Sequence, residues 1–334
     1  MTSKTFAVVG GGLAGLSMTY YLIQSGISVD VFEKKSIGAG ASGLAAGLLH
    51  GYAGAHARKN RFADESIMHS LSLLEQCSRN LEIPVYQKTG ILRLALSEQQ
   101  LEDFHFCAMQ NPDVTWIDQF ECQQRFPELN PNPGIIIHNG YLVDCPRYLK
   151  QLWELCQKNG DAKLIKEEFS PLRSSHYDGT VICAGAGSVN FSSLSQAVKL
   201  RRVKGQLLKF SNPRIVSPLP LPVNSKVYIV NQPNHEGFLL GATFERQFND
   251  AQPDINKAKE ELLPQALKLF PDLKECKLTD CLADLRISTP DHLPAIGKCA
   301  ENTWYFTGLG SKGLLYHSLY AQKLLQSISY DLDL

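Results

Sequence analysis

The stretch FAVVGGGLAG, residues 6–15, decides the fold of this chain. An entirely apolar run, Ala7–Val9, leads directly into the pattern G-x-G-x-x-G. After a helical spacing of apolar residues, a second apolar run ends at Glu33, about 20 residues beyond the glycines. This order of strand, glycine turn, helix, strand and acid predicts a dinucleotide-binding βαβ unit within an α/β fold.

Each residue of the glycine turn has a physical task in such a unit. Gly10 permits the tight turn, Gly12 lets a pyrophosphate approach the main chain, and Gly15 lets the helix pack on the strand. Leu13 and Ala14 open the helix, whose N-terminus offers unpaired N–H groups and a positive dipole end. We therefore expect all five residues to contribute to cofactor binding.

Glu33 determines which dinucleotide fits. Its carboxylate can accept hydrogen bonds from a ribose diol, whereas it would repel a 2′-phosphate, so NADP is disfavoured. Lys34, the next residue, is expected in the same pocket. The alternative, a glycine-rich turn without a ligand, is weak because strand, helix and acid are all in register.

Composition indicates an ordinary globular protein of one large or two intertwined domains. The chain has 334 residues, 44% of them hydrophobic and 20% charged, and its formal net charge is zero. Charge balance therefore indicates neither nucleic acid nor an anionic membrane as a partner. The nine cysteines show no metal-ligand spacing and read as reduced thiols. We expect a cytoplasmic enzyme without a metal, a signal peptide or a membrane span.

Basic residues nevertheless gather at two places in the chain. The clusters are His56, Arg58, Lys59 and Arg61, and then Arg201, Arg202 and Lys204. Such clusters are most often solvated surface, but they would suit a phosphate backbone if they framed a binding site.

Three further stretches of small residues indicate close approach of the main chain to a flat ligand. They span residues 37–47, 183–188 and 308–313. The additional cofactor contacts expected from them are Ala41, Ser42, Gly43, Ala46, Gly47, Ala184, Gly185, Gly308, Gly310, Ser311, Lys312 and Gly313.

Periodicity and turn residues give a coarse secondary structure. Helices are expected at 61–82, 146–160, 256–270 and from 313 onward, strands at 90–96, within 203–245 and at 303–307, and irregular structure at 111–140.

Four motifs together carry a family resemblance. They are the N-terminal glycine turn with Glu33, V-I-C-A-G-A-G-S at 181–188, R-x-x-T-x-D-x-x-P-x-I-G at 286–297, and G-L-G-S-K-G-L at 308–314. The combination resembles the D-amino-acid-oxidase-type flavoproteins, which include glycine oxidase, sarcosine oxidase and D-amino-acid dehydrogenase. The resemblance implies FAD as the dinucleotide and a Rossmann-like FAD-binding domain interleaved with an antiparallel-sheet substrate domain.

The resemblance also implies domain boundaries. The FAD-binding domain is expected at 1–85, 141–200 and 276–334, and the substrate domain at 86–140 and 201–275.

One branch of the family is more similar. Gly40–Gly43, Asp291–Pro294 and Leu309–Leu314 are similar to the oxidase domain of the bifunctional tRNA wobble-uridine-modifying enzymes, MnmC. This similarity implies carboxymethylaminomethyl-uridine in tRNA as the substrate. The chain departs from that pattern at His50-Gly51, where an aromatic-proline pair is usual, and it lacks the methyltransferase half. A free amino acid such as glycine, sarcosine or a D-amino acid is the alternative.

The shared reaction of the family implies roles for particular side chains. It oxidises a C–N bond next to a carboxylate, with hydride transfer to flavin N5. Arg286 matches the family's carboxylate-binding arginine, and Tyr228 matches a tyrosine that reaches the same carboxylate. His50 and Lys312 are further candidates near the flavin, and the N–H groups from Gly310 onward would stabilise negative charge at its N1–C2=O edge.

Each of these assignments has a structural alternative. Arg286 would form an ion pair with Asp284 or Asp291, Tyr228 would be a core residue, and His50 would be an ordinary loop or core histidine. Two other functional classes also stay open, a non-catalytic binding module stabilised by FAD and an NAD-dependent dehydrogenase. Because residues 283–287 contain no cysteine, we expect FAD to be bound non-covalently.

Overall fold

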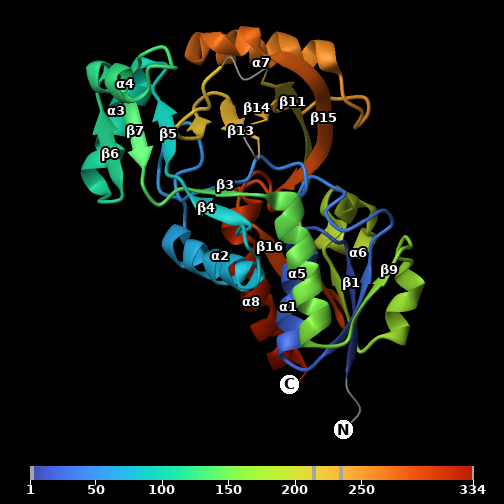
Figure 1. Cartoon of the computed structure of the whole chain (residues 1–334). Coiled ribbons are helices and arrows are strands. Elements are labelled where there is room, and N and C mark those ends of the chain that lie inside the picture. Colours follow the sequence, from blue (N-terminus) through green and yellow to red (C-terminus); the bar gives the residue numbers. More distant parts are fainter. Residues whose placement is uncertain (1–3, 213–215, 233–235, 333–334) are drawn as a thin grey trace.

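The computed structural model describes residues 4–212, 216–232 and 236–332. Within these ranges the strands form three sheets, of six, eight and three strands. Figure 1 shows the six-stranded sheet in the lower part of the molecule, together with both termini, and the eight-stranded sheet in the upper part. The expected mixed α/β fold with a parallel and a largely antiparallel sheet is confirmed.

The six-stranded sheet is built around the predicted βαβ unit. From edge to edge its strands are β16 (Ala295–Ala300), β17 (Thr303–Thr307), β10 (Gly179–Ile182), β1 (Thr5–Val9), β2 (Ser28–Phe32) and β9 (Ala162–Ile165). All neighbours are parallel except the antiparallel pair β16–β17. The apolar side chains of β1 are buried, as expected for the central strand of such a sheet.

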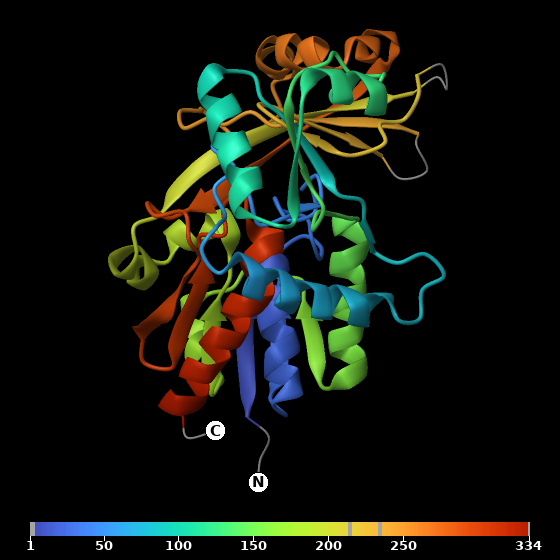
Figure 2. The same ribbon diagram turned by 90° about the vertical axis from the view of Figure 1, so that its left-hand side faces the viewer.

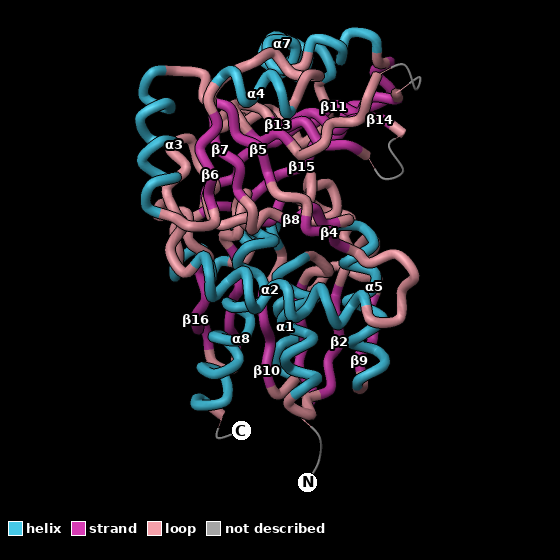
Figure 3. Tube along the Cα trace, turned by 60° about the vertical axis from the view of Figure 1, so that its left-hand side comes forward, coloured by secondary structure: helices cyan, strands magenta, loops and turns pink. Residues whose placement is uncertain are grey.

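Four helices pack together over this sheet. They are α1 (Leu13–Gln24), α2 (Ala63–Ser78), α5 (Cys145–Asn159) and α8 (Gly313–Asp331). Helix α1 contacts both α5 and α8, and α2 lies across α5 and α8 (Figure 3). The αL residue expected after the first helix is present, since Gly26 has a φ of +77°.

The eight-stranded sheet collects strands from distant parts of the chain. Its order is β15 (Lys277–Ser288), β11 (Arg201–Ser211), β14 (Gly237–Gly241), β13 (Tyr228–Asn231), β12 (Val223–Asn224), β5 (Ile91–Leu94), β7 (Gly134–Ile137) and β6 (Val114–Ile117). Helix α7 (Ile255–Leu269) covers its outer face (Figure 2). Ala258 and Leu262 of α7 pack there against Phe238 and Leu240 of β14.

A small third sheet lies where the two larger parts meet. It pairs β3 (Leu48–Leu49), β8 (Tyr141–Val143) and β4 (Tyr86–Lys88). Two connecting pieces of 3-10 helix, η1 (Pro171–His176) and η2 (Gly185–Asn190), and the short α6 (Ser192–Ala197) belong to the lower part (Figure 1).

Residues 111–140 were expected to be irregular, and this prediction was wrong. They contain β6, α4 (Gln119–Arg125) and β7, and the preceding α3 (Glu98–Gln110) was not anticipated. The prolines and asparagines that suggested a loop lie between the elements: four stand at residues 130–133, between α4 and β7, and the others are Asn111, Pro112, Pro127 and Asn139. The flanking strands are only four residues long, so periodicity is a weak signal for them.

The long strand β15 joins the eight-stranded sheet, although residues 276–334 were expected in the FAD-binding domain. It pairs with β11 along its whole length, and its last residue, Ser288, also bridges to Leu309 beside the other sheet. The expected β-rich stretch 203–245 includes residues 213–215 and 233–235, which lie outside the described residues.

No helix in the described part of the chain is long and apolar enough to cross a membrane. Among the same residues no group of three His, Cys, Asp or Glu side chains is placed to hold a metal ion. The cysteines, all of which are described, are unpaired, and all but Cys299 are buried.

Candidate active site

A cavity of about 560 Å³ lies at the carboxyl ends of the parallel strands and reaches the eight-stranded sheet. In open parallel sheets, ligands bind outside the carboxyl ends of the strands, at the point where the strand order reverses. The residues that follow four neighbouring strands line it, and on its other side so do residues of β11, β13 and β15. The lining includes Gly10 after β1, Glu33 after β2, Ala184 after β10, Gly308 after β17, Gly205 of β11, Tyr228 of β13 and Arg286 of β15.

Nearly all of the predicted site residues line this one cavity. The exceptions are Gly15 and Gly43, which pack behind it. A Cβ on Gly15 would overlap the carbonyl oxygen of Gly10, and a Cβ on Gly43 would overlap that of Gly38. Both positions therefore require glycine because main chain approaches main chain, as the motif predicts for Gly15.

The first turn of α1 offers main-chain donors to the cavity. Its N-cap residue, Gly12, provides no side-chain cap, and Ser42 Oγ accepts the N–H of Leu13 at 3.1 Å. Gly10 has a φ of +114°, and a Cβ there would overlap the carbonyl oxygen of Cys183. This turn suits a phosphate group held by N–H groups and the helix dipole.

Glu33 lies beside this turn. Its two carboxylate oxygens accept the N–H groups of Gly11 and Lys35, each at 3.0 Å. Each oxygen keeps capacity for another donor, such as a ribose hydroxyl. Lys34 also lines the cavity, and its ammonium lies 3.8 Å from Glu168.

A second helix begins at the same cavity. Helix α8 has Lys312 as its N-cap, again without a side-chain cap, so main-chain N–H groups face the cavity there. The ammonium of Lys312 lies 3.4 Å from the carbonyl oxygen of His292, and burial lowers its pKa while Asp291 opposes that change. The main-chain N–H groups of this turn are therefore better placed to contact a ligand than the ammonium of Lys312.

The candidate substrate end is built by two side chains that lie across glycines. Arg286 extends from β15 over Gly205 of β11, where a Cβ would overlap the guanidinium. Tyr228 of β13 lies over its cross-strand partner Gly241 of β14, where a Cβ would overlap the phenol. Both glycines stand in strands, where a missing side chain makes room for close approach.

The electrostatics of this pair suit an anion. No carboxylate of the described residues lies within ion-pair distance of Arg286, so neither Asp284 nor Asp291 occupies it as the structural alternative supposed. Burial lowers the pKa of Arg286, but a guanidinium keeps its charge. Burial also raises the pKa of Tyr228 to about 12, against the effect of Arg286, so the phenol stays protonated and can donate.

His50 is part of the cavity wall. Its Nδ1 accepts the N–H of Tyr52 at 3.2 Å, and its Nε2 lies 3.0 Å from Asn224 Nδ2. Burial, aided by the charge of Arg93, lowers its pKa to about 3, so the ring is neutral near pH 7. A neutral ring engaged on both sides has a structural task, whichever ligand lies beside it.

Arg93 explains how this wall is held. It is 3% exposed, and its guanidinium donates to the carbonyl oxygens of Tyr52, Gly54 and Asn224 at 2.6, 2.7 and 3.0 Å. It thereby joins the loop after β3 to β12. No signal in the sequence identified Arg93, because its acceptors lie about 40 and 130 residues away in the chain.

Several other lining residues were also missed, among them Gly205, Gln206, Asn224 and Asp284. Asp284 stands two residues before Arg286 in β15, and burial raises the pKa of its carboxyl group despite the Leu285 N–H and Lys35. The mid-strand glycine Gly205 was the one detectable signal, because glycine is unfavourable in a strand unless something lies over it.

Comparison with known proteins assigns the chain to a family. Residues 5–326 match the FAD dependent oxidoreductase family, DAO. The chain is 30% identical over 322 residues to glycine oxidase of Bacillus licheniformis, covering 88% of this chain and 84% of that protein. It is 24% identical over 350 residues to the tRNA 5-methylaminomethyl-2-thiouridine biosynthesis bifunctional protein MnmC of Idiomarina loihiensis.

That second match covers 98% of this chain and 56% of the relative, so the chain spans little more than half of that protein's length. Among solved structures, glycine oxidase from Geobacillus kaustophilus has a TM-score of 0.83 at 22% identity, covering 98% of this chain and 95% of the other. This likeness shows a shared fold.

The cavity fits the cofactor that the family name requires. Two helices, α1 and α8, begin at it with N-cap residues whose own side chains form no cap, so one can face a pyrophosphate and the other an electron-rich ring edge. Glu33 stands where a ribose would need an acceptor, and Gly10 leaves space that a Cβ would fill. The nicotinamide alternative is thereby set aside: the chain belongs to the FAD-dependent oxidoreductase family, and its cofactor is FAD.

Proposed function

We propose that this enzyme oxidises the C–N bond of a glycine-type amine, in which the carbon next to nitrogen also bears a carboxylate. One observation carries the proposal. Arg286 and Tyr228 come from different strands, lie across the strand glycines Gly205 and Gly241, and reach the FAD cavity with no carboxylate of the described residues paired to the guanidinium. A partly buried cation without a counter-ion favours an anionic ligand.

The side chains divide the work of binding and orientation. Arg286 holds the substrate carboxylate through parallel N–H donors, and the Tyr228 hydroxyl adds another. FAD, when bound, supplies the hydride acceptor. Holding the carboxylate fixes the direction of the Cα–H bond. The site therefore accelerates oxidation by orienting the substrate and needs no nucleophile.

The other candidate residues keep different tasks. His50, with a pKa of about 3, holds the wall and is assigned no proton transfer near pH 7. The amine must therefore arrive neutral. The N–H groups at the start of α8, next to Lys312, place partial positive charge beside the cavity.

A free amino acid is our first candidate for the source of the glycine unit, although the sequence motifs favoured tRNA. Two residues of the first basic cluster already have partners: Lys59 is ion-paired with Asp64 at 2.8 Å, and His56 Nδ1 contacts Asp103 Oδ2 at 2.6 Å. The guanidinium of Arg202 is also engaged, by the carbonyl oxygen of Ala186 at 3.0 Å. The Lys59–Asp64 pair offsets one of the positive charges that a phosphate backbone would need, and the formal net charge of the chain is zero.

Carboxymethylaminomethyl-uridine in tRNA is the second candidate. It contains the same –NH–CH2–COO⁻ unit, and the similarity to MnmC along 98% of the chain supports it. Arg58 and Arg201 form no ion pair among the described residues and remain available to phosphate.

The test is anaerobic bleaching of the bound FAD, followed by absorbance, against glycine, sarcosine, D-alanine and tRNA that carries the modified uridine. Bleaching by a free amino acid supports the first candidate, and bleaching by the tRNA alone supports the second. If nothing bleaches the flavin, amine oxidation is the wrong assignment and a non-catalytic binding module is favoured. If Arg286→Ala bleaches as fast as the unaltered enzyme, amine oxidation stands and the role given to Arg286 is wrong.

A further inference from the structure

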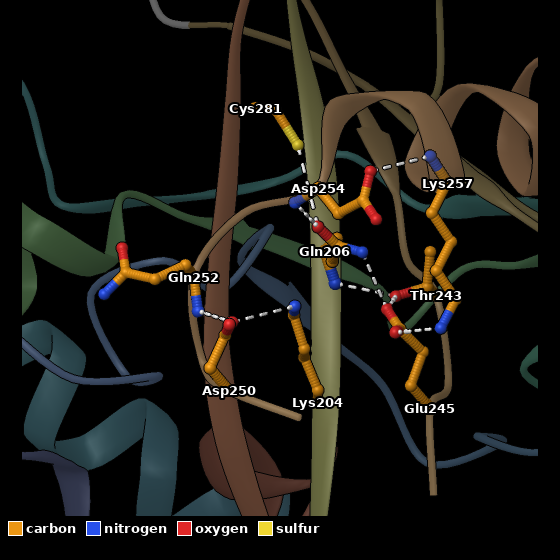
Figure 4. A network of polar contacts seen from close by, with 9 residues as sticks. All are labelled: Lys204, Gln206, Thr243, Glu245, Asp250, Gln252, Asp254, Lys257 and Cys281. Carbon is orange, nitrogen blue, oxygen red and sulfur yellow. Dashed lines mark hydrogen bonds and ion pairs between the residues drawn. The ribbon is translucent and has the colours of Figure 1, made fainter. Parts of the chain in front are cut away.

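A network of polar contacts surrounds Glu245, in the segment that connects β14 to α7 (Figure 4). Glu245 is 6% exposed. Its Oε1 accepts from Gln206 Nε2 and from Thr243 Oγ1, both at 2.8 Å, and its Oε2 lies 2.6 Å from the ammonium of Lys257 on α7. One carboxylate thus joins β11, the connecting segment and α7.

The network reaches Arg286 through the main chain of Thr243. Gln206 N–H donates to Thr243 Oγ1 at 2.9 Å, and Thr243 N–H donates to the carbonyl oxygen of Gln206 at 3.1 Å. The carbonyl oxygen of Thr243 then accepts from Arg286 Nη2 at 3.1 Å. Within the described ranges this is the hydrogen bond that the structure gives the guanidinium, so the position of Thr243 determines where the planar group lies.

Glu245 is ionised in this setting. Burial raises the pKa of its carboxyl group, but the donors Lys257, Thr243 and Gln206 together outweigh burial and leave the pKa below its usual value. A buried charge is costly unless it is fully paired, so packing alone would be served as well by an apolar residue. The contacts of Glu245 instead connect it, through Thr243, to Arg286 at the cavity.

We propose that Glu245 is a positioning residue for the substrate carboxylate: it fixes the Thr243 carbonyl, which orients Arg286 so that the other guanidinium N–H groups face the cavity. This inference rests on the proposed function, because it concerns how the carboxylate-binding arginine is aimed. It adds a residue that neither touches the cavity nor belongs to the glycine motifs.

The first experiment measures acetate binding to the FAD-loaded enzyme by the change in flavin absorbance. Glu245→Gln keeps the size of the side chain but loses the pairing with Lys257. We expect acetate to bind about tenfold more weakly and KM for the amine substrate to rise by a similar factor, with kcat and FAD content nearly unchanged.

Asp250→Asn is the matched control. Asp250 lies in the same segment and faces the Lys204 ammonium at 3.9 Å, but it has no contact with Thr243. Acetate affinity should not change. Lys257→Met breaks the same ion pair from its more exposed partner and should weaken acetate binding in the same direction, which keeps the test usable if Glu245→Gln folds poorly.

A double-mutant cycle separates positioning from general support of the fold. In an Arg286→Met background, Glu245→Gln should cause no further loss of acetate affinity, because its effect passes through the missing guanidinium. If the two losses multiply, Glu245 acts independently of Arg286 and the inference is wrong.

Failure of the proposed function gives a different pattern. If Arg286→Met leaves acetate binding unchanged, the proposed carboxylate site itself is wrong. If Arg286→Met weakens acetate binding and Glu245→Gln does not, the site stands and only the positioning role is refuted.

Discussion

The two ends of the cavity use glycine for opposite purposes. At the nucleotide end, Gly10 and Gly15 let main chain approach main chain, and the ligand would be bound by N–H groups of α1. At the substrate end, Gly205 and Gly241 make room for the side chains of Arg286 and Tyr228, which would bind the ligand themselves. Recognition at the first end depends on one continuous stretch, and at the second end on the pairing of four strands.

The comparison yields a clear expectation for mutation. An added methyl group at the nucleotide end should affect the cofactor, whereas one at the substrate end should affect the substrate and leave the cofactor bound. The variants below test this separation.

Gly15→Ala should have the largest effect. The new Cβ would overlap the carbonyl oxygen of Gly10, which cannot move without distorting the turn. We expect FAD to bind at least about a hundredfold more weakly, because overpacking against main chain costs a few kcal/mol. The flavin-to-protein absorbance ratio after gel filtration measures this.

Gly187→Ala is its control. Gly187 also lines the cavity, but a Cβ there would lie 3.6 Å from that of Ala184, an ordinary contact. Full retention of FAD by Gly15→Ala would contradict the account of the nucleotide end.

Arg286→Met should have the next largest effect, and on the substrate alone. Removing the cation that holds a carboxylate should lower kcat/KM by about a hundredfold to a thousandfold, or about 3–4 kcal/mol. FAD content should stay at that of the unaltered enzyme, since the guanidinium serves the other end. Steady-state kinetics with the best amine of the panel provides the measurement, and unchanged kcat/KM would refute the role of Arg286.

Gly205→Ala should reproduce a milder form of that loss. The new methyl group would overlap the Arg286 guanidinium, which must turn away from the cavity. We expect KM to rise about tenfold while FAD remains bound, because a displaced guanidinium keeps its charge but loses its direction. If Gly205→Ala loses FAD as readily as Gly15→Ala, the two ends are not separate.

The last effect concerns acid sensitivity and neither ligand, and it comes from two buried histidines, one in the cavity wall and one in α8. His50 and His317 are buried and neutral, with pKa values lowered by burial to about 3 and about 4 from 6.5. Below pH 6.5 the unfolded chain binds protons that the native chain does not, so stability falls as pH decreases from 6.5 toward 4. Each histidine should contribute up to about 2 kcal/mol between pH 7 and pH 5.

Urea unfolding at these two pH values measures this difference. His317→Gln should unfold with a smaller loss between them than the unaltered protein. An equal loss in both would show that His317 titrates normally in the native state.

The nucleotide end could be predicted from the sequence because its geometry is local. Gly10 to Gly15 and Glu33 lie within one βαβ unit, and the αL conformation of Gly26 followed from its place after the helix. Local spacing was enough to anticipate that Gly10 to Ala14 and Glu33 face one cavity.

At the substrate end, the sequence predicted which side chains form the site but not how the strands bring them together. Arg286 and Tyr228 were identified through family motifs. The position of Arg286 over Gly205, however, depends on the register of β15 against β11, and the two residues are about 80 positions apart in the chain. Strand register is fixed by the packing of the whole sheet. For the same reason Glu245 and Arg93 carried no signal, since the Glu245 carboxylate contacts the side chain of Gln206, 39 residues away, and Arg93 contacts main chain 41 residues away.

The end of β15 has a consequence for the length of substrate that the enzyme can accept. The carbonyl oxygen of Ile287, the residue after Arg286, accepts the N–H of Gly310 at 2.8 Å, in the turn that begins α8. Arg286, the proposed carboxylate-binding residue, and helix α8 at the cofactor cavity are therefore joined by one hydrogen bond and a short stretch of chain, and not only by the packing of one sheet on another. This hydrogen bond fixes the spacing between Arg286 and the start of α8. An α-amino acid and a β-amino acid held there by the same carboxylate would present different carbons to the cofactor. Only one of the two substrates can therefore present the carbon that is oxidised.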